Sequence, residues 1–166
     1  MLFVFDSAPL IYFGKTRVLE KIAKLNAKFV IPKTVYKEVV ETGLEAGFED
    51  AAYVKELVNS GLFVVKEVPI SDKRKILAGI DEADMETLLL AKELKGAAIT
   101  DDQKVRNLAS LENTESAGSV YIILLLVKNK IITKIEAKSL IDKIIEFGWY
   151  CSTDLYTVIV ESLATL

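Results

Sequence analysis

Short apolar runs recur along the chain at residues 2–5 (LFVF), 28–31 (KFVI), 62–65 (LFVV) and 97–100 (AAIT). Their apolar residues are consecutive and do not alternate with polar ones, which is typical of strands buried on both faces of a parallel sheet. A fifth strand is expected near residues 112–116, where the apolar signal is weaker. The pattern therefore predicts a sheet whose strands are separated by long intervening segments.

Helical patterns fill those intervening segments. Residues 7–25 predict two short helices. Pro32 is expected to open a helix that runs through Val40 and is closed by Gly43, because proline suits a first helical turn and glycine often follows a last one. Further helices are predicted over residues 48–60, 81–95 (closed by Gly96), 102–110, 118–129, 133–147 and 153–163.

This alternation of strands and helices predicts the α/β class, a three-layer α/β/α fold around a central, mostly parallel five-stranded sheet. Connections between parallel strands are right-handed crossovers, so helices should cover both faces of the sheet. A chain of 166 residues is one domain by length, and its 51% content of hydrophobic residues permits a large core. We expect residues 1–166 to form that single domain, with the helices of residues 118–164 packed on the same core.

Charge and composition exclude several classes of protein. The net charge is −3, which does not suggest a nucleic-acid coat or a protein of the membrane surface. The apolar run Val120–Val127 is too short to span a bilayer, and the N-terminal segment lacks the basic region of a signal peptide. The lone Cys151 offers no disulfide and no zinc cluster. We therefore expect a cytoplasmic protein.

Acidic residues stand where predicted strands end. Asp6 directly follows the first apolar run, and Asp101 and Asp102 follow the run at residues 97–100. Ligands of open α/β sheets bind at the carboxyl ends of the strands. Because the chain has no histidine and one cysteine, any metal must be held by oxygen. Carboxylates that converge on such a frame indicate a site for Mg²⁺ or Mn²⁺ and phosphoryl chemistry.

Each of these acids also has a structural interpretation. Asp6 could cap the helix that begins near Pro9, since aspartate is a good N-cap. One of Asp101 and Asp102 could cap the next helix, although two adjacent acids repel each other and one cap suffices. For Asp6, the position at a strand end favours the functional interpretation.

Two further acids lie within predicted helices. Asp84 shares an apolar stripe with Leu88, whereas Glu86 should point roughly the other way. A carboxylate on a buried stripe needs a partner or a metal, and a capping box with Asp81 explains it equally well. Glu38 lies on the flank of the apolar face of its helix and could face either a cleft or solvent.

Three segments, in this order, resemble the PIN-domain family, the small Mg²⁺-dependent ribonuclease fold found in the toxin halves of VapBC-type toxin–antitoxin pairs. They are FDSAPLIYFGK, IPKTVYKEVVETG and DEADMETLLLAKELKGAAITDD. They are similar to the family's opening strand with its first acid, to its helix with the second acid, and to its later helix, strand and Thr-x-Asp motif. The late segments LLVKNKIIT and EFGWYCSTDLYTVIVES look most like a toxin-like subgroup of PIN proteins. The resemblance covers nearly the whole chain.

The resemblance implies a role for each acid. The four family acids match, in chain order, Asp6, Glu38, Asp84 and Asp102. Asp6, Asp84 and Asp102 would hold one Mg²⁺ or Mn²⁺ ion, and Glu38 would help to hold a second ion or orient water. Asp101 stands where the family often has Asn and could add a ligand. Ser7 matches a hydroxyl residue that could bind phosphate or metal-bound water.

The resemblance also implies a substrate and partners. The substrate would be RNA, single-stranded or structured, and a small antitoxin protein is a possible partner. Lys15, Arg17, Lys104 and Arg106 flank the acid-bearing segments and could clamp the RNA backbone, although plain solvation explains them equally well. PIN toxins commonly form two-fold dimers, so we expect a homodimer built partly from the helices after Ser7 and after Phe48. A monomer that offers this surface to an antitoxin is the alternative.

Three other classes of function compete with a ribonuclease. A catalytically silent PIN-like module would bind RNA or protein without cleaving it. A receiver domain needs an aspartate after its third strand, where this chain has Lys66 and Glu67. A haloacid-type phosphatase needs Asp-x-Asp after its first strand, where this chain has Asp6 and Ser7 followed by Ala8. The last two classes therefore fit the sequence poorly.

Overall fold

A computed structural model describes residues 1–68 and 79–166 of the chain. Five strands form one sheet in the order β3-β2-β1-β4-β5, and every pairing is parallel. The strands are β1 (Leu2–Phe5), β2 (Lys28–Pro32), β3 (Phe63–Lys66), β4 (Ala97–Ile99) and β5 (Glu115–Ala117). The predicted α/β class is confirmed, and the sheet is all-parallel where the sequence indicated a mostly parallel one.

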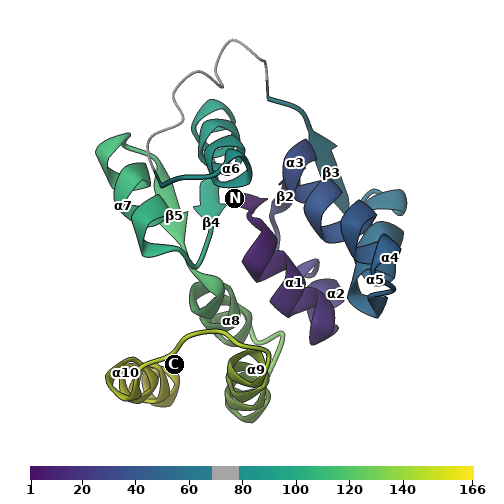
Figure 1. Cartoon of the computed structure of the whole chain (residues 1–166). Helices are drawn as coiled ribbons and strands as arrows, with labels where there is room; N and C mark the ends of the chain where they lie inside the picture. Colours follow the sequence, from purple (N-terminus) through teal and green to yellow (C-terminus); the bar gives the residue numbers. More distant parts are fainter. Residues whose placement is uncertain (69–78) are drawn as a thin grey trace.

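Helices cover both faces of this sheet (Figure 1). They are α1 (Ser7–Lys15), α2 (Leu19–Ile22), α3 (Lys33–Tyr36), the π-helical η1 (Lys37–Thr42), α4 (Gly43–Glu45), α5 (Glu49–Asn59), α6 (Glu82–Glu93), α7 (Gln103–Leu111), α8 (Ser119–Lys128), α9 (Lys134–Glu146) and α10 (Thr153–Thr165). In the described part of the chain, none of them is long and apolar enough to cross a membrane.

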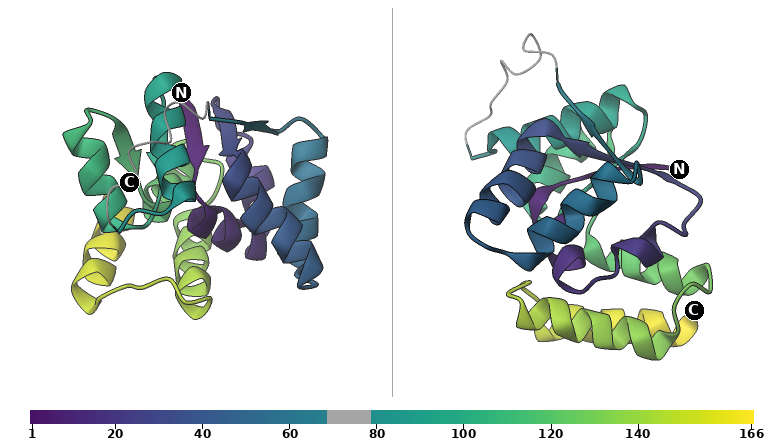
Figure 2. Two further views of the ribbon diagram at one scale, coloured as in Figure 1. Left: turned by 45° about the horizontal axis from the view of Figure 1, so that its top comes forward. Right: turned by 90° about the vertical axis from the view of Figure 1, so that its right-hand side faces the viewer.

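The side chains of β1 point alternately into two hydrophobic clusters, one on each face of the sheet. Phe3 and Phe5 point into the larger cluster with residues of α1, α5 and α8, whereas Val4 points into the smaller one with residues of α6 and α7. The last two helices contact α8 and each other, and Ile144 and Ile159 join the larger cluster from there. Figure 2 shows α9 and α10 as an outer layer beneath α8.

The prediction that Gly43 closes the helix after Pro32 is wrong. Gly43 has ordinary right-handed helical angles, and the helical chain continues through η1 into α4. A Cβ at this position would lie 2.6 Å from the Cβ of Ala51 on α5. Glycine is therefore needed for the close approach of two helices, and Gly47, with φ of 77°, makes the turn instead.

The role expected for Gly96 also differs. Helix α6 ends through Lys95, which adopts the left-handed conformation with φ of 52°, whereas Gly96 has no positive φ. A Cβ on Gly96 would lie 2.7 Å from the backbone oxygen of Leu2, so the residue is small because β1 passes directly beside it. The fifth strand begins at Glu115, three residues later than the start of the expected range.

Candidate active site

The carboxyl groups of Asp6 and Asp84 meet at the carboxyl end of β1, and we call them the acid pair. Asp6 is the only residue between β1 and α1, and its side chain is 7% exposed. Its Oδ1 accepts a hydrogen bond from Ser7 N at 2.7 Å, and its Oδ2 accepts one from Thr100 Oγ1 at 2.9 Å. The half-buried Asp84, in the first turn of α6, shares a further hydrogen bond with Asp6.

Burial raises the pKa values of both members of the acid pair, and the negative charge of Asp81 adds to the effect. Burial is the main cause for Asp6, and the hydrogen bonds from Ser7, Thr100 and Asp84 act against it. The pKa of Asp84 is raised to about 7 by burial and then by the negative charges of Asp6 and Asp81. Their shared hydrogen bond favours ionised Asp6 and neutral Asp84. Without a cation, the proton of the pair therefore belongs on Asp84.

Asp81 is a third acid near the pair, and sequence reasoning considered it only as a cap. It does cap α6, because its Oδ1 accepts a hydrogen bond from Asp84 N at 2.9 Å. The side chain of Asp84 contacts Asp6. The capping interpretation of Asp84 therefore holds for its backbone, while its carboxyl group is available to the site.

A hydrogen bond with Ser7 holds Glu38 at the same edge of the sheet. The Ser7 hydroxyl donates a hydrogen bond to Glu38 Oε2 at 2.5 Å, which joins α1 to the first turn of η1. π-Helical turns occur frequently at functional sites, and nothing in the sequence signals this one. Ser7 thus holds the exposed carboxylate of Glu38 beside the residue that follows Asp6.

The carboxylate of Asp101 accepts hydrogen bonds from the first residue of helix α8. Its Oδ1 accepts a hydrogen bond from Ser119 N at 2.7 Å, and its Oδ2 accepts one from Ser119 Oγ at 2.6 Å. A Cβ on Gly118 would lie 2.8 Å from Asp101 Oδ1, so a glycine is needed at that position. Asp101 therefore satisfies the amino end of α8, a role that sequence reasoning did not assign to it.

Asp102 caps α7, and the sequence predicted that either Asp101 or Asp102 would do so. Its Oδ1 accepts a hydrogen bond from Lys104 N at 2.6 Å. Its backbone N donates to Thr100 Oγ1 at 3.2 Å, and the same hydroxyl donates to Asp6. The fully buried Thr100 thus connects the backbone of Asp102 to the acid pair.

The four cations expected to clamp RNA divide into two groups. Arg106 stays at the end of β4, where it donates to Thr100 O at 2.9 Å, and Lys104 is exposed on the same helix. Lys15 ends α1 and Arg17 lies two residues beyond, at the opposite end of that helix from Asp6. The expectation that all four flank the acids therefore fits the first group only.

Glu86 does not point away from the core as its spacing suggested. Its side chain is 1% exposed, and Oε2 accepts a hydrogen bond from Thr34 N at 3.1 Å in the first turn of α3. Helix N-termini favour negative charge, so this buried carboxylate holds α6 against α3. A pattern within one helix could not reveal it, because the partner belongs to another element.

The donor set of the site is suited to a hard divalent cation. Mg²⁺ keeps several water ligands and is often bound through one or two carboxylates, and the acid pair supplies two that repel each other. Within residues 1–68 and 79–166, no group of three or more Asp, Glu, Cys or His side chains is placed to hold a metal ion. The acid pair thus fits a partly hydrated ion, and a third ligand from Asp102 stays a prediction.

Comparisons with known proteins agree with this architecture. The chain is similar to a PilT N-terminus domain protein from the hyperthermophilic archaeon Sulfolobus solfataricus P2, with a TM-score of 0.55 and 19% identity over 76% of this chain and 94% of that one. It is also similar to a domain of a functionally unknown protein from Methanocaldococcus jannaschii DSM 2661, with a TM-score of 0.49 and 20% identity over 70% of this chain and 89% of that one. The comparison with curated proteins found no match.

The first of these likenesses shows the fold alone, because the identity is low. The family comparison goes further, since the family described as DUF3368: PIN domain matches residues 2–165. With the match spanning nearly every residue, the chain belongs to the PIN-domain family.

Proposed function

We propose that this protein is a Mg²⁺- or Mn²⁺-dependent endoribonuclease, which hydrolyses RNA phosphodiester bonds and acts as the toxin of a toxin–antitoxin-like pair. The observation that carries the proposal is the acid pair at the carboxyl end of β1, with a pKa of about 7 at Asp84. Two carboxyl groups in direct contact cost stability unless a cation or a proton lies with them, and such perturbed groups cluster at functional sites.

Asp6 and Asp84 would hold the cation, and Asp102 and Asp101 are the further expected ligands. When bound, the ion supplies an activated water and offsets negative charge on the scissile phosphate. The hydrogen bonds from Ser7 N and Thr100 Oγ1 fix the Asp6 carboxylate in one orientation, so that it need not reorganise on binding. The cation would displace the proton that Asp84 holds, because a hard cation requires ionised carboxylates.

Glu38 is proposed to accept a proton from the attacking water, since the chain has no histidine for this role. Its position depends on Ser7, whose hydroxyl donates to Glu38 Oε2. Ser7 therefore acts here by orienting Glu38, while a direct contact with phosphate remains compatible with its place at the N-terminus of α1.

The RNA backbone would approach this negative site past Arg106 and Lys104, with Lys15 and Arg17 further along α1. Arg106 is the best placed of the four, because its bond to Thr100 O fixes the guanidinium at the strand end that carries the acids. A fixed guanidinium binds phosphate with good geometry. A catalytically silent RNA- or protein-binding module is the second candidate function, and it is favoured by the lack of a three-ligand acidic group among the described residues.

The test is cleavage of a broad panel of RNAs with Mn²⁺, with and without EDTA. We expect cleavage that EDTA abolishes, and a loss of about 100-fold or more in Asp6→Asn, the magnitude typical of removing one electrostatic group at a reacting centre. Asp154→Asn, the same change at an exposed position in the first turn of α10, is the matched control and should keep full activity. Wild-type protein that cleaves nothing would leave the silent module as the function.

A further inference from the structure

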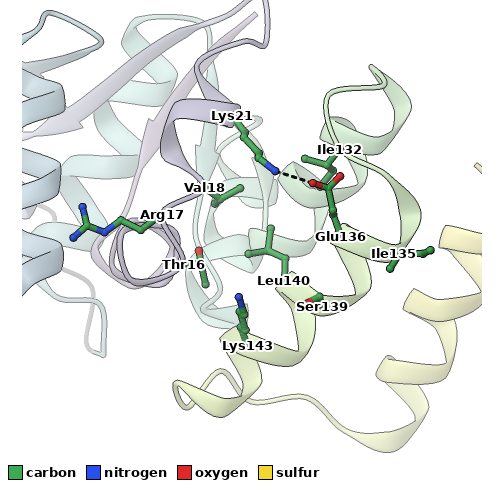
Figure 3. A pocket seen from close by; sticks show the side chains of 10 residues that line it. All are labelled: Thr16, Arg17, Val18, Lys21, Ile132, Ile135, Glu136, Ser139, Leu140 and Lys143. Carbon is green, nitrogen blue, oxygen red and sulfur yellow. Dashed lines mark hydrogen bonds and ion pairs between the residues drawn. The ribbon is translucent and has the colours of Figure 1, made fainter.

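A cavity of about 400 Å³ lies between the turn after α1 and helix α9, remote from the acid pair in the fold. Its floor is apolar, formed by Val18, Ile132 and Leu140, and its rim is basic, with Arg17, Lys21 and Lys143. Figure 3 shows Lys143 reaching up from α9 towards Thr16, and Lys21 bridged to Glu136 at the other end. Three cations and one acid, Glu136, thus surround the cavity.

The three cations around the cavity are not equally available to a ligand. Lys21 lies 3.0 Å from Glu136, which offsets its charge. The guanidinium of Arg17 lies 4.6 Å from the ring centre of Tyr53, and Figure 3 shows it pointing away from the cavity. Lys143 is exposed, and within the described residues it makes no ion pair.

One exposed aromatic side chain lies beside a cation at the end of α1. The ammonium of Lys15 lies 5.5 Å from the ring centre of Phe147, which directly follows α9. Phe147 is four residues beyond Lys143, so the two share one face of the helical turn. The Phe147 ring is 44% exposed. Aromatic faces beside cations are the combination that binds single-stranded nucleic acid, because the rings stack on bases and the cations hold phosphates.

Helix α1 connects this surface to the acid pair. It starts at Ser7, beside Asp6, and ends at Lys15, so its nine residues separate the two places by about 13 Å. We propose that the surface formed by Lys15, Lys143 and Phe147, which we call the α1–α9 seam, binds the single-stranded RNA that extends from the scissile phosphate. The inference rests on the proposed ribonuclease function, which it extends from the point of cleavage to the path of the strand.

The charge contribution can be tested without cleavage. A fluorescent RNA of about 12 nucleotides, within the range that single-strand surfaces cover, is bound by the full-length protein in EDTA at several salt concentrations. The double variant Lys15→Gln, Lys143→Gln should bind about 10-fold more weakly at low salt and lower the slope of log K against log salt by about 0.7 for each lysine. The matched control is Lys28→Gln, Lys128→Gln, two exposed lysines at the amino end of β2 and the end of α8, which should change neither.

The aromatic contribution needs its own variant. Phe147→Ala should weaken binding at least about five-fold without changing the salt slope, since stacking is not ionic. Phe147→Tyr keeps an aromatic ring and should bind as the wild type. A polyglutamate peptide of equal charge should compete poorly, and equal competition would assign the seam to an acidic protein partner and overturn the proposal. Unchanged binding in both the lysine variant and Phe147→Ala would overturn it as well.

The outcomes for the seam and for the nuclease are separable. Weakened binding in the seam variants together with no Mn²⁺-dependent cleavage would retain the RNA surface and reject the ribonuclease. Normal binding in those variants together with EDTA-sensitive cleavage would reject the seam and retain the ribonuclease.

Discussion

The acid pair makes the stability of the metal-free protein depend on pH, and Asp84→Asn should remove that dependence. In the folded protein the pKa of Asp84 is about 7, compared with 3.8 for an unperturbed aspartate. A raised carboxyl pKa means that ionisation opposes folding, so stability falls as pH rises through about 7. It is regained as pH falls towards 3.8, where the unfolded chain also takes up the proton.

The magnitude follows from the size of that shift. A difference of about 3 units corresponds to roughly 4 kcal/mol at 1.36 kcal/mol per unit, which is a ceiling. Asp84 is only half buried, so solvent screening reduces the effect, and about 1–2 kcal/mol is expected. An amide at this position can still donate a hydrogen bond to Asp6 but carries no charge. Asp84→Asn should therefore stabilise the metal-free protein by about 1–2 kcal/mol at pH 8, with roughly half of that gain remaining at pH 5.

Urea unfolding in EDTA at these two pH values measures the effect. Glu93→Gln, an exposed acid on the same helix, is the matched control and should show no difference between the two conditions. Adding Mg²⁺ at pH 8 should stabilise the wild type and close the gap to the Asn variant, because an ion that binds only the folded state shifts the equilibrium towards it. A variant that is no more stable than the wild type at pH 8, or equally stabilised at both pH values, would refute the reasoning.

Three further predictions concern other parts of the molecule. Ser7→Ala should lower kcat of RNA cleavage about 10-fold while Ser7→Thr keeps it, because a hydroxyl must orient Glu38; equal loss in both would contradict this role. Asp101→Ala should lower the free energy of unfolding by about 1–2 kcal/mol in a urea titration, since Ser119 N and Oγ lose their acceptor; no change would show that water replaces it. Light scattering should give a homodimer that Phe48→Ser, at a 58% exposed ring beside α5, weakens; a mass that stays at 18.4 kDa on concentration would rule the homodimer out.

The fold could be predicted from the sequence because its strands are buried on both faces. In β1, Phe3 and Val4 face opposite clusters, so the strand must be apolar throughout and is easily recognised. Strand β5 lies at the edge of the sheet and reads Glu-Ser-Ala, so its signal was weak and its position was misplaced by a few residues. The roles of Gly43 and Gly96 were missed because each is set by a neighbour distant in sequence, Ala51 or Leu2.

The site was predictable to the extent that strand ends determine it. Asp6 was identified because it directly follows β1, and its contact with Asp84 follows from the apolar stripe of α6. Nothing in the sequence indicates that the hydroxyl of Thr100 donates a hydrogen bond to Asp6. The bonds of Asp101 to Ser119 cross between elements, and no local pattern announces them.

Capping and metal binding are not alternatives at this site. Asp6, Asp81 and Asp102 cap α1, α6 and α7, and each uses one carboxylate oxygen for the cap. An ionised carboxylate offers about four lone-pair positions, so a cap bond leaves acceptor capacity for a cation. Asp84 does not cap, and burial and the charges of Asp6 and Asp81 raise the pKa of its carboxyl group to about 7. The fold thus fixes the orientation of the capping acids through their backbone bonds, and under the proposed function a metal ion would replace the proton of Asp84.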